Sequence, residues 1–316
     1  MKYNSKFPHG IMFHRFKNFK IKDTGHGALS AKDLSKLIKF IGRKRILSPD
    51  EWMNKLKKNK LKNQDLCLTF DDGLKSQLNI ALPVLNKYNI KAFWFIHSNT
   101  SPKNFDKSEI FSILIVKKFK KYKNFTNKFL KYININPNIF NSTSFNKYYK
   151  TEKNLYSFFS KIEIKYKFLR DIYFTRHKFE NLMENFFKSF GLNVKDFYKN
   201  TWMNKKDLIK LNKKGHMIGM HSFSHPYRMS LLSKKQQLNE YHKNFNNIKF
   251  ITKKKPLAMS HPLDSYNKTS LKILNNLGIL CGFRSHTKTC KGKKINPSYL
   301  ELAREDPSNI LKLINN

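Results

Sequence analysis

Two adjacent carboxylates, Asp71 and Asp72, follow a short apolar run in the sequence TFDDG, residues 69–73. The apolar run predicts a strand and the residues after Gly73 predict a helix, so the pair lies where a strand ends. Such a pair can form a turn and a helix cap. It can also form half of an active site, in which one carboxylate binds a metal ion and the other acts as general base.

Two histidines, His221 and His225, follow a second apolar run in the sequence HMIGMHSFSH, residues 216–225. Imidazoles four residues apart reach one divalent ion if they lie on one helical turn or in a tight loop. This spacing alone is often incidental. Two imidazoles, one carboxylate and a water molecule are, however, a common ligand set of hydrolytic metal sites, so the histidines and the acidic pair support each other.

Strand and helix signals alternate around both motifs, which predicts an α/β fold with a parallel sheet or barrel and helices outside. Side chains at the carboxyl ends of such strands form the active site. The predicted strands are residues 10–16, 65–70, 91–97, 216–222, 256–260, 279–285 and 298–303. Ser30, Ser48 and Ser233 are expected helix caps. Pro83 would kink a helix at 75–88 unless the helix begins there.

Residues 98–200 interrupt this alternation and are rich in Lys, Asn, Phe and Tyr. They contain helical patterns without strand-turn-helix repeats, so we predict a mainly helical insertion within a single domain spanning 1–316. The insertion is either a packing unit or a lid over the substrate.

The composition limits the classes of function. The formal charge is +42, from 63 Lys and Arg against 21 Asp and Glu. The lysines are spread along the chain and no nucleic-acid-binding module is present, so we favour a compositional bias and expect no nucleic-acid partner. No apolar stretch is long enough to span a membrane. Three cysteines (Cys67, Cys281 and Cys290) without close pairing, and an N-terminus without a leader pattern, predict a cytoplasmic location.

The motifs TFDDG and HSFSH together resemble the polysaccharide deacetylases, the chitooligosaccharide deacetylase (NodB) homology domain of carbohydrate esterase family 4. KYNIKAFWFI, LNKKGHMIGMHSFSHP and the opening MFHRF are similar to the surroundings of those motifs. The resemblance covers roughly residues 10–97 and 201–310, with the insertion outside it. It implies a deformed (β/α) barrel that removes N-acetyl groups from an N-acetylated sugar or glycan precursor.

The resemblance also implies roles for individual residues. Asp71 would be the general base, while Asp72, His221 and His225 would hold a divalent metal, usually zinc, with cobalt or nickel as alternatives. Ser222 would position the loop between the two histidines.

Two family motifs are altered. The third, R-x-P-Y-G-x-x-N, is matched by SHPLDSYN, residues 260–267, with Ser260 in place of the arginine. The backbone N–H of Leu263 could still donate to the oxyanion. The last motif, L-x-H, normally supplies the histidine that protonates the leaving amine, but Arg304 stands there, and arginine does not deprotonate near pH 7.

The general acid must therefore come from elsewhere. His261, His286 and His14 are the candidates at strand ends, and we favour His261. Arg304 would contact the substrate or oxyanion, pair with a carboxylate in place of the missing arginine, or lie in an exposed turn. Arg284 is ambiguous in the same way, with a surface or structural use favoured.

Three hypotheses remain open. The first is a metal-dependent deacetylase of an N-acetylated sugar. The second is a hydrolase of a non-sugar amide on the same fold, which the two altered motifs allow. The third is a non-catalytic basic binding protein with a degenerate site. The sequence determines neither the sugar nor the oligomeric state.

Overall fold

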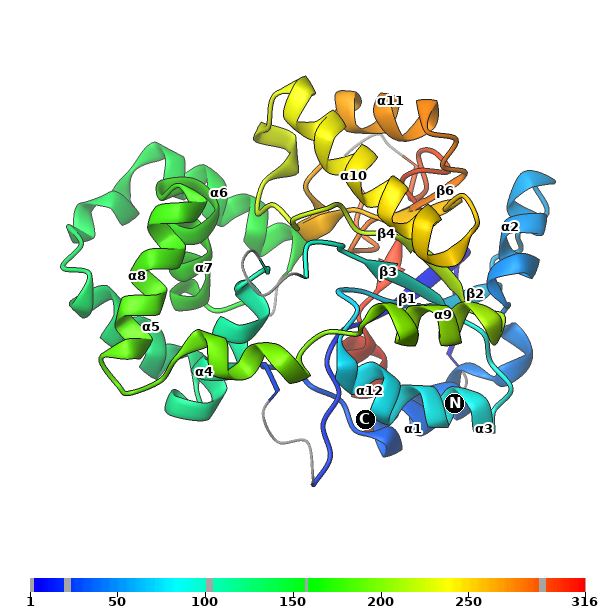
Figure 1. Cartoon of the computed structure of the whole chain (residues 1–316), viewed down its shortest axis with the longest axis horizontal. Helices are drawn as coiled ribbons and strands as arrows, with labels where there is room; N and C mark the ends of the chain where they lie inside the picture. Colours follow the sequence, from blue (N-terminus) through cyan, green and yellow to red (C-terminus); the bar gives the residue numbers. More distant parts are fainter. Residues whose placement is uncertain (1–2, 20–23, 101–104, 157–158, 290–293, 316) are drawn as a thin grey trace. The chain divides into compact units, whose positions relative to one another are not determined.

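The computed structural model describes residues 3–19, 24–100, 105–156, 159–289 and 294–315 (Figure 1). Within these ranges the chain forms two compact units. The first contains the strands and the helices that flank them, and the second is formed mainly by Asp106–Lys199. The second unit occupies the part of the chain where the helical insertion is predicted.

A parallel sheet forms the centre of the first unit, with the strand order β6-β5-β4-β3-β2-β1-β7. The strands curve into a nearly closed barrel with helices on its outside, which confirms the predicted deformed (β/α) barrel (Figure 1). The strands are β1 (His9–Phe13), β2 (Leu66–Phe70), β3 (Phe93–Ile96), β4 (Met217–Met220), β5 (Ala258–Ser260), β6 (Cys281–Phe283) and β7 (Arg304–Glu305).

The segment that links β6 to β1 differs from the predicted strand at 298–303. Leu302 forms an isolated parallel bridge with Phe283 of β6, and from Arg304 onward the chain pairs with β1 instead. The segment therefore pairs first with β6 and then with β1. The prediction of one continuous strand there is wrong. A Cβ on Gly282 would lie 2.5 Å from the Leu300 carbonyl oxygen, so this close approach requires glycine.

Helices cover the outside of the barrel, and their starts follow the caps expected from the sequence. Ser30, Ser48 and Ser233 each accept a hydrogen bond from a backbone N–H in the first turn, and each forms a capping box. The helices of this unit are α1 (Ala31–Ile41), α2 (Pro49–Lys57), α3 (Leu82–Lys87), α9 (Lys205–Lys213), α10 (Lys234–Thr252), α11 (Lys268–Asn276) and α12 (Pro307–Asn315).

The barrel interior is an apolar cluster closed at one end by α2. Phe93 and Phe95 point into it, whereas Trp94, between them, packs in the outer cluster with the surrounding helices. This is the alternation expected of a strand buried on both faces. Trp52 of α2 belongs to the interior cluster. An isolated parallel bridge between Ile46 and Leu66 ties the segment before α2 to the start of β2. The carboxyl ends of the strands lie at the opposite end of the barrel, where the candidate site is formed.

Pro83 produces a wide turn at the start of its helix. Residues Gln77–Ala81 form a π-helical turn, and α3 begins directly after it with Pro83 in its first turn. A proline lacks the N–H that an α-helix needs and its ring crowds the carbonyl four residues earlier, so the ladder widens by one residue here. The chain is already helical at residues 75–76, before this turn, so of the two alternatives stated for Pro83 the structure has a helix distorted at the proline rather than a helix that begins there.

The second unit is helical and held together by aromatic side chains. Phe125, fully buried, contacts the rings of Phe129, Tyr166 and Phe187 at centroid distances of 5.6, 5.2 and 6.1 Å. Its helices are α4 (Ser108–Phe119), α5 (Tyr122–Tyr132), α6 (Thr143–Leu155), α7 (Lys161–Phe168) and α8 (Arg176–Lys188). Within the described residues of both units, we find no helix with the length and apolar character needed to cross a bilayer.

Candidate active site

The carboxyl ends of the strands bring the sequence-predicted residues to one edge of the barrel. The Asp71 N–H still bonds to the Phe13 carbonyl (3.0 Å), and the His221 N–H bonds to the Ile96 carbonyl (3.2 Å). These are continuations of the sheet ladder, so both residues are fixed in position where their strands end. Because β2 and β4 both flank β3, the two motifs meet at this edge.

Asp71 is held by Arg304. The guanidinium donates from Nη1 to Oδ1 (2.7 Å) and from Nη2 to Oδ2 (2.8 Å), a bidentate pair in which both side chains are buried. Ser260 Oγ also donates to Asp71 Oδ2 (3.1 Å), and Arg304 Nη2 donates to Ser260 Oγ (2.8 Å). Of the open possibilities for Arg304, the structure therefore has the pairing with a carboxylate, and the exposed turn is wrong because the side chain is buried.

This environment keeps Asp71 ionised. Burial raises the pKa of its carboxyl, but the Arg304 guanidinium and the nearby His221 and His14 outweigh burial, so the pKa lies below its ordinary value. Arg304 and Ser260 therefore hold both oxygens of an ionised Asp71 carboxylate.

Asp72 points to the two histidines instead. Its Oδ1 lies 3.4 Å from His221 Nε2 and 3.6 Å from His225 Nε2, and one ligand atom from each residue lies within 4.8 Å of the others. Hydrogen bonding to His221 and the charges of the neighbouring histidines outweigh the effect of burial and hold the pKa of Asp72 well below its ordinary value.

The donor set fits a divalent metal ion. His221 Nδ1 lies 2.9 Å from the Ser260 carbonyl oxygen, an arrangement in which Nδ1–H donates and Nε2 keeps its lone pair for a metal. Two imidazole nitrogens and one carboxylate oxygen are ligands that zinc takes in hydrolytic sites, with a further position open to water.

The backbone at Asp72, Ser222 and His225 is in the left-handed region. Asp72 has φ 72°, Ser222 φ 63° and His225 φ 53°, which non-glycine residues rarely adopt. Ser222 Oγ accepts the His225 N–H (3.2 Å), so it ties the loop between the two histidines. Residues held in unfavourable backbone conformations concentrate at functional sites, where the surrounding structure enforces them.

The structure does not support His261 as the general acid. It is buried, its Nε2 bonds to the Leu300 carbonyl (2.8 Å), and its ring stacks on Tyr266 at 4.1 Å. Burial lowers the pKa of His261 to about 4. The ring of His261 is therefore enclosed and engaged away from Asp71, unlike that of His14.

His14 is the histidine candidate that faces Asp71. Its Nε2 lies 3.8 Å from Asp71 Oδ2, and its side chain keeps 33% of its surface exposed. Burial is the main influence on the pKa of His14 and lowers it, while Asp72 and Asp71 partly oppose that effect. The sequence signal for His14 was its position directly after β1 in MFHRF.

Leu263 lies in a strained turn after β5. Leu263 (φ 48°) and Asp264 (φ 57°) are consecutive left-handed residues, and Leu263 remains 39% exposed. The Asp264 carboxylate lies 2.9 Å from His286 Nε2 and accepts the Ser285 N–H (2.8 Å). His286, the third candidate acid, is therefore engaged with Asp264.

Arg284 is structural rather than exposed. Its Nε donates to the Glu301 carbonyl (3.0 Å) and Nη1 to the Lys288 carbonyl (3.1 Å), which holds the segment before β7. Its own carbonyl accepts from Arg304 Nε (2.6 Å). Sequence reasoning missed Ser260 and Gln77 as partners of the acidic motif, because neither residue type signals such a contact.

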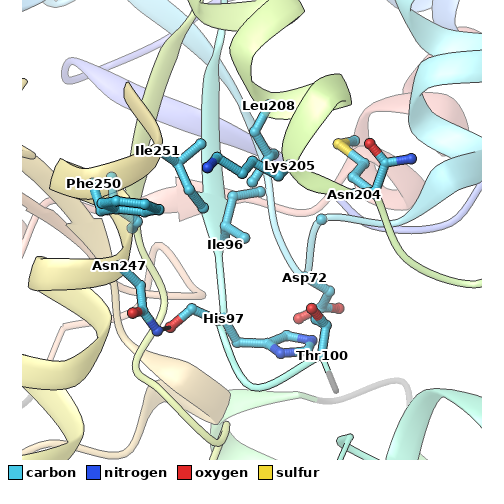
Figure 2. Close-up of a pocket in the computed structure, with 14 residues that line it drawn as sticks. Asp72, Ile96, His97, Thr100, Asn204, Lys205, Leu208, Asn247, Phe250 and Ile251 are labelled. Carbon is cyan, nitrogen blue, oxygen red and sulfur yellow. Dashed lines mark hydrogen bonds between the residues drawn. The ribbon is translucent and has the colours of Figure 1, made fainter. Parts of the chain in front are cut away.

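A pocket of about 230 Å³ opens beside the site (Figure 2). Asp72 and His97 line one part of it, and the His97 ring lies 5.6 Å from the His225 ring. Figure 2 shows the side chains of α9 and α10 around the remainder, among them Lys205 and Phe250. The ammonium of Lys205 lies 4.3 Å from the Phe250 ring centroid.

Comparisons with known proteins agree with this geometry. The model of the polysaccharide deacetylase family matches residues 58–127 and 174–282, more than half of the chain. The match enters the helical unit from both sides and omits only 128–173 between its two segments. The expectation that the whole of 98–200 lies outside the family pattern is therefore wrong. A search of curated proteins finds no match.

Solved structures with the same fold include three bacterial proteins. The Streptococcus pyogenes deacetylase PplD, in complex with acetate, has a TM-score of 0.55 at 14% identity and covers 98% of each chain. IcaB from Ammonifex degensii has a TM-score of 0.56 at 12% identity and covers 100% of this chain and 98% of its own. A de-N-acetylase from Aggregatibacter actinomycetemcomitans has a TM-score of 0.52 at 13% identity and covers 96% and 98%.

At such low sequence identity these structural matches establish the fold alone. The match to the family model establishes membership of the family. With the motifs TFDDG and HSFSH meeting at the strand ends, the chain belongs to the polysaccharide deacetylase family and is a carbohydrate deacetylase.

Proposed function

We propose that the protein removes the N-acetyl group from an N-acetylated sugar or glycan precursor in a metal-dependent reaction. The observation that carries this proposal is the division of the acidic pair. Asp71 is bound to Arg304 and Ser260, whereas Asp72 lies against His221 and His225. Two neighbouring carboxylates with different partners suit two different tasks.

Asp72, His221 and His225 would hold the metal ion, for which zinc is the first choice and cobalt or nickel the alternatives. When bound, such an ion lowers the pKa of a water molecule and polarises the acetamide carbonyl. The three ligands come from two rigid strand ends, so their positions are set before any metal binds.

Asp71 accepts the proton of the attacking water. Its carboxylate is ionised and oriented by Arg304, which leaves it little freedom to turn away. The Leu263 N–H, on the neighbouring turn, donates to the oxygen of the former carbonyl as negative charge develops there.

His14 delivers a proton to the leaving nitrogen. Its Nε2 is 3.8 Å from Asp71 Oδ2, and a small movement of the ring brings the two within hydrogen-bond distance. The proton that Asp71 takes from water can pass to His14 and then to the amine as the carbon–nitrogen bond breaks. The products are acetate and a free amino sugar.

The direct test is acetate release by the purified chain. N-acetylated oligosaccharides, nucleotide-linked N-acetyl sugars and glycan precursors are incubated with the protein and zinc, cobalt or nickel. We expect acetate from at least one substrate, and we expect Asp71→Asn to abolish it. Asp65→Asn is the matched control, because Asp65 precedes the same strand and pairs with Lys55 away from the site. The proposal fails if none of the sugars releases acetate, and release from non-sugar amides alone would favour a different hydrolase.

We also propose a cytoplasmic location. The support is that Cys67 and Cys281 are buried free thiols, which suit a reducing compartment, while Cys290 lies outside the described residues. Fractionation of cells that express the full-length protein, followed by immunoblotting, tests this location.

A further inference from the structure

The Gln77 side chain bridges the segments that follow strands β1 and β2, where His14 and Asp71 lie. Its side chain is fully buried, and its Nε2 donates to the His14 carbonyl (2.8 Å) and to the Asp71 carbonyl (2.7 Å). Among the described residues, Oε1 of the same amide is buried without a hydrogen-bond partner. The side chain therefore uses both of its donors and leaves its acceptor unsatisfied.

The position of this bridge follows from the sheet. β1 and β2 are paired up to Phe13 and Phe70, and the Asp71 N–H to Phe13 carbonyl bond is the last rung. Beyond this hydrogen bond strands β1 and β2 separate, so the carbonyls of His14 and Asp71 no longer have partners in the sheet ladder. Gln77 reaches both carbonyls from the first residue of the π-helical turn that precedes α3.

The unsatisfied acceptor makes the buried Gln77 amide costly. A buried acceptor without a partner costs about 1–3 kcal/mol, and an apolar side chain of similar size would avoid that cost. An amide in this position is favoured only because two carbonyls need donors at once. π-helical turns of this kind occur often at functional sites.

We propose that Gln77 is a positioning residue that keeps His14 at a fixed distance from Asp71 during proton delivery, an inference that rests on the proposed function. When Gln77 is lost, Asp71 retains Arg304 and Ser260. The change therefore falls mainly on His14, whose side chain is partly exposed.

The test compares two buried glutamines, each changed to methionine. Gln237 is as buried as Gln77, donates to the Leu232 carbonyl and accepts from Ser270 Oγ, away from the acidic motif. Both Gln77→Met and Gln237→Met should lower the melting temperature. Gln77→Met alone should lower kcat for the N-acetyl sugar, by roughly 10- to 100-fold with KM nearly unchanged, because a misplaced catalytic group costs that much.

A second substrate separates positioning from general damage. An aryl acetate ester has a leaving group that needs no protonation, so its hydrolysis depends on Asp71 but not on His14. Gln77→Met should retain most of the ester activity while losing amide activity. Equal losses on both substrates, or equal losses in the two methionine variants, would overturn the proposal. Gln77→Asn, which keeps the donors on a shorter side chain, replaces Gln77→Met if that variant does not fold, and it should show the same split.

A failure of the proposed function is recognised separately. If the wild-type protein releases no acetate from any substrate, crystal structures of the variants decide about Gln77 instead. The distance from His14 Nε2 to Asp71 Oδ2 is 3.8 Å with Gln77 present. An unchanged distance in the Gln77 variant would contradict the positioning role, and an increased distance would support it.

Discussion

Arg304 forms a bidentate pair with Asp71 although the two residues are 233 positions apart in the chain. Both side chains are buried, and Arg304 Nε is also bound to the Arg284 carbonyl. The arginine expected in the third family motif is absent, since Ser260 stands there. The structure thus supplies the arginine partner of Asp71 from a distant part of the chain.

Arg304→Met should destabilise the fold and abolish activity. Removing one member of a buried ion pair leaves an unpaired buried charge and costs about 3–5 kcal/mol. Urea unfolding measures this loss. Lys55→Met is the control, because the Lys55–Asp65 pair is more exposed and should be worth about 1 kcal/mol or less. Equal effects of the two changes would contradict the importance of the Arg304 pair. Arg304→Lys should recover stability only in part, since lysine cannot bind both oxygens in this planar geometry.

Zinc should stabilise the protein through Asp72, His221 and His225. A ligand that binds only the folded state stabilises it by about 2.7 kcal/mol at a concentration of 100 Kd. We expect the melting temperature to rise with added zinc and to fall again with a chelator. His225→Gln should remove this response, whereas His177→Gln, on the helical unit, should leave it intact. A zinc response that survives in His225→Gln would place the metal elsewhere.

Replacing His14 should impair catalysis, whereas replacing His261 should impair stability. His14→Asn should lower kcat on amide substrates by roughly 100-fold or more, the usual contribution of a general acid, with little loss of stability. His261→Asn should lower the melting temperature, because it loses the Leu300 bond and the stacking on Tyr266. Steady-state kinetics together with thermal unfolding distinguish the two. A large kcat loss in a stably folded His261→Asn protein would restore His261 as the acid.

The Leu263–Asp264 turn should depend on His286. Left-handed backbone costs a non-glycine residue roughly 1–2 kcal/mol, and the Asp264 side chain holds the turn through His286 and Ser285. Glycine adopts this conformation without that cost. His286→Phe should therefore destabilise the wild type by about 1–3 kcal/mol but have little effect on the Asp264→Gly background. Unfolding of the four proteins in a double-mutant cycle measures this coupling. The same cost of His286→Phe in both backgrounds would show that the two residues act independently.

Stability should fall as the pH drops from 6.5 towards 4. Burial lowers the pKa of His9, His216 and His261 to about 4 from their ordinary 6.5. In this window the unfolded chain binds protons that the folded chain excludes, so each histidine contributes stability that is complete above pH 6.5 and lost below it. At pH 5 the loss is about 2 kcal/mol for each residue. Urea titrations at pH 7 and pH 5 measure it, and His216→Asn should reduce the difference. A wild-type stability that is equal at both values would contradict these pKa shifts.

The sequence by itself determined the features that depend on neighbouring residues. Capping boxes at Ser30, Ser48 and Ser233 mark helix starts because the cap and its partner lie within one turn. Alternating strand and helix patterns predicted a parallel sheet or a barrel, and the resemblance to the deacetylase family favoured the barrel. The motifs TFDDG and HSFSH placed four candidate residues at strand ends. A local pattern suffices for these features because the interactions that produce them are local.

Only the tertiary structure decided which distant side chains serve those motifs. The sequence left the pairing of Arg304 with a carboxylate as one of several possibilities, and only the structure shows that the carboxylate is Asp71. Nothing near Gln77 in the sequence indicates that it bridges His14 and Asp71. His261, His286 and His14 were all candidates at strand ends and the sequence favoured His261, but His261 is buried against Tyr266, whereas His14 faces Asp71. The physical reason is that barrel closure, through the segment that passes from β6 to β1, sets these distances, and closure depends on the whole chain at once.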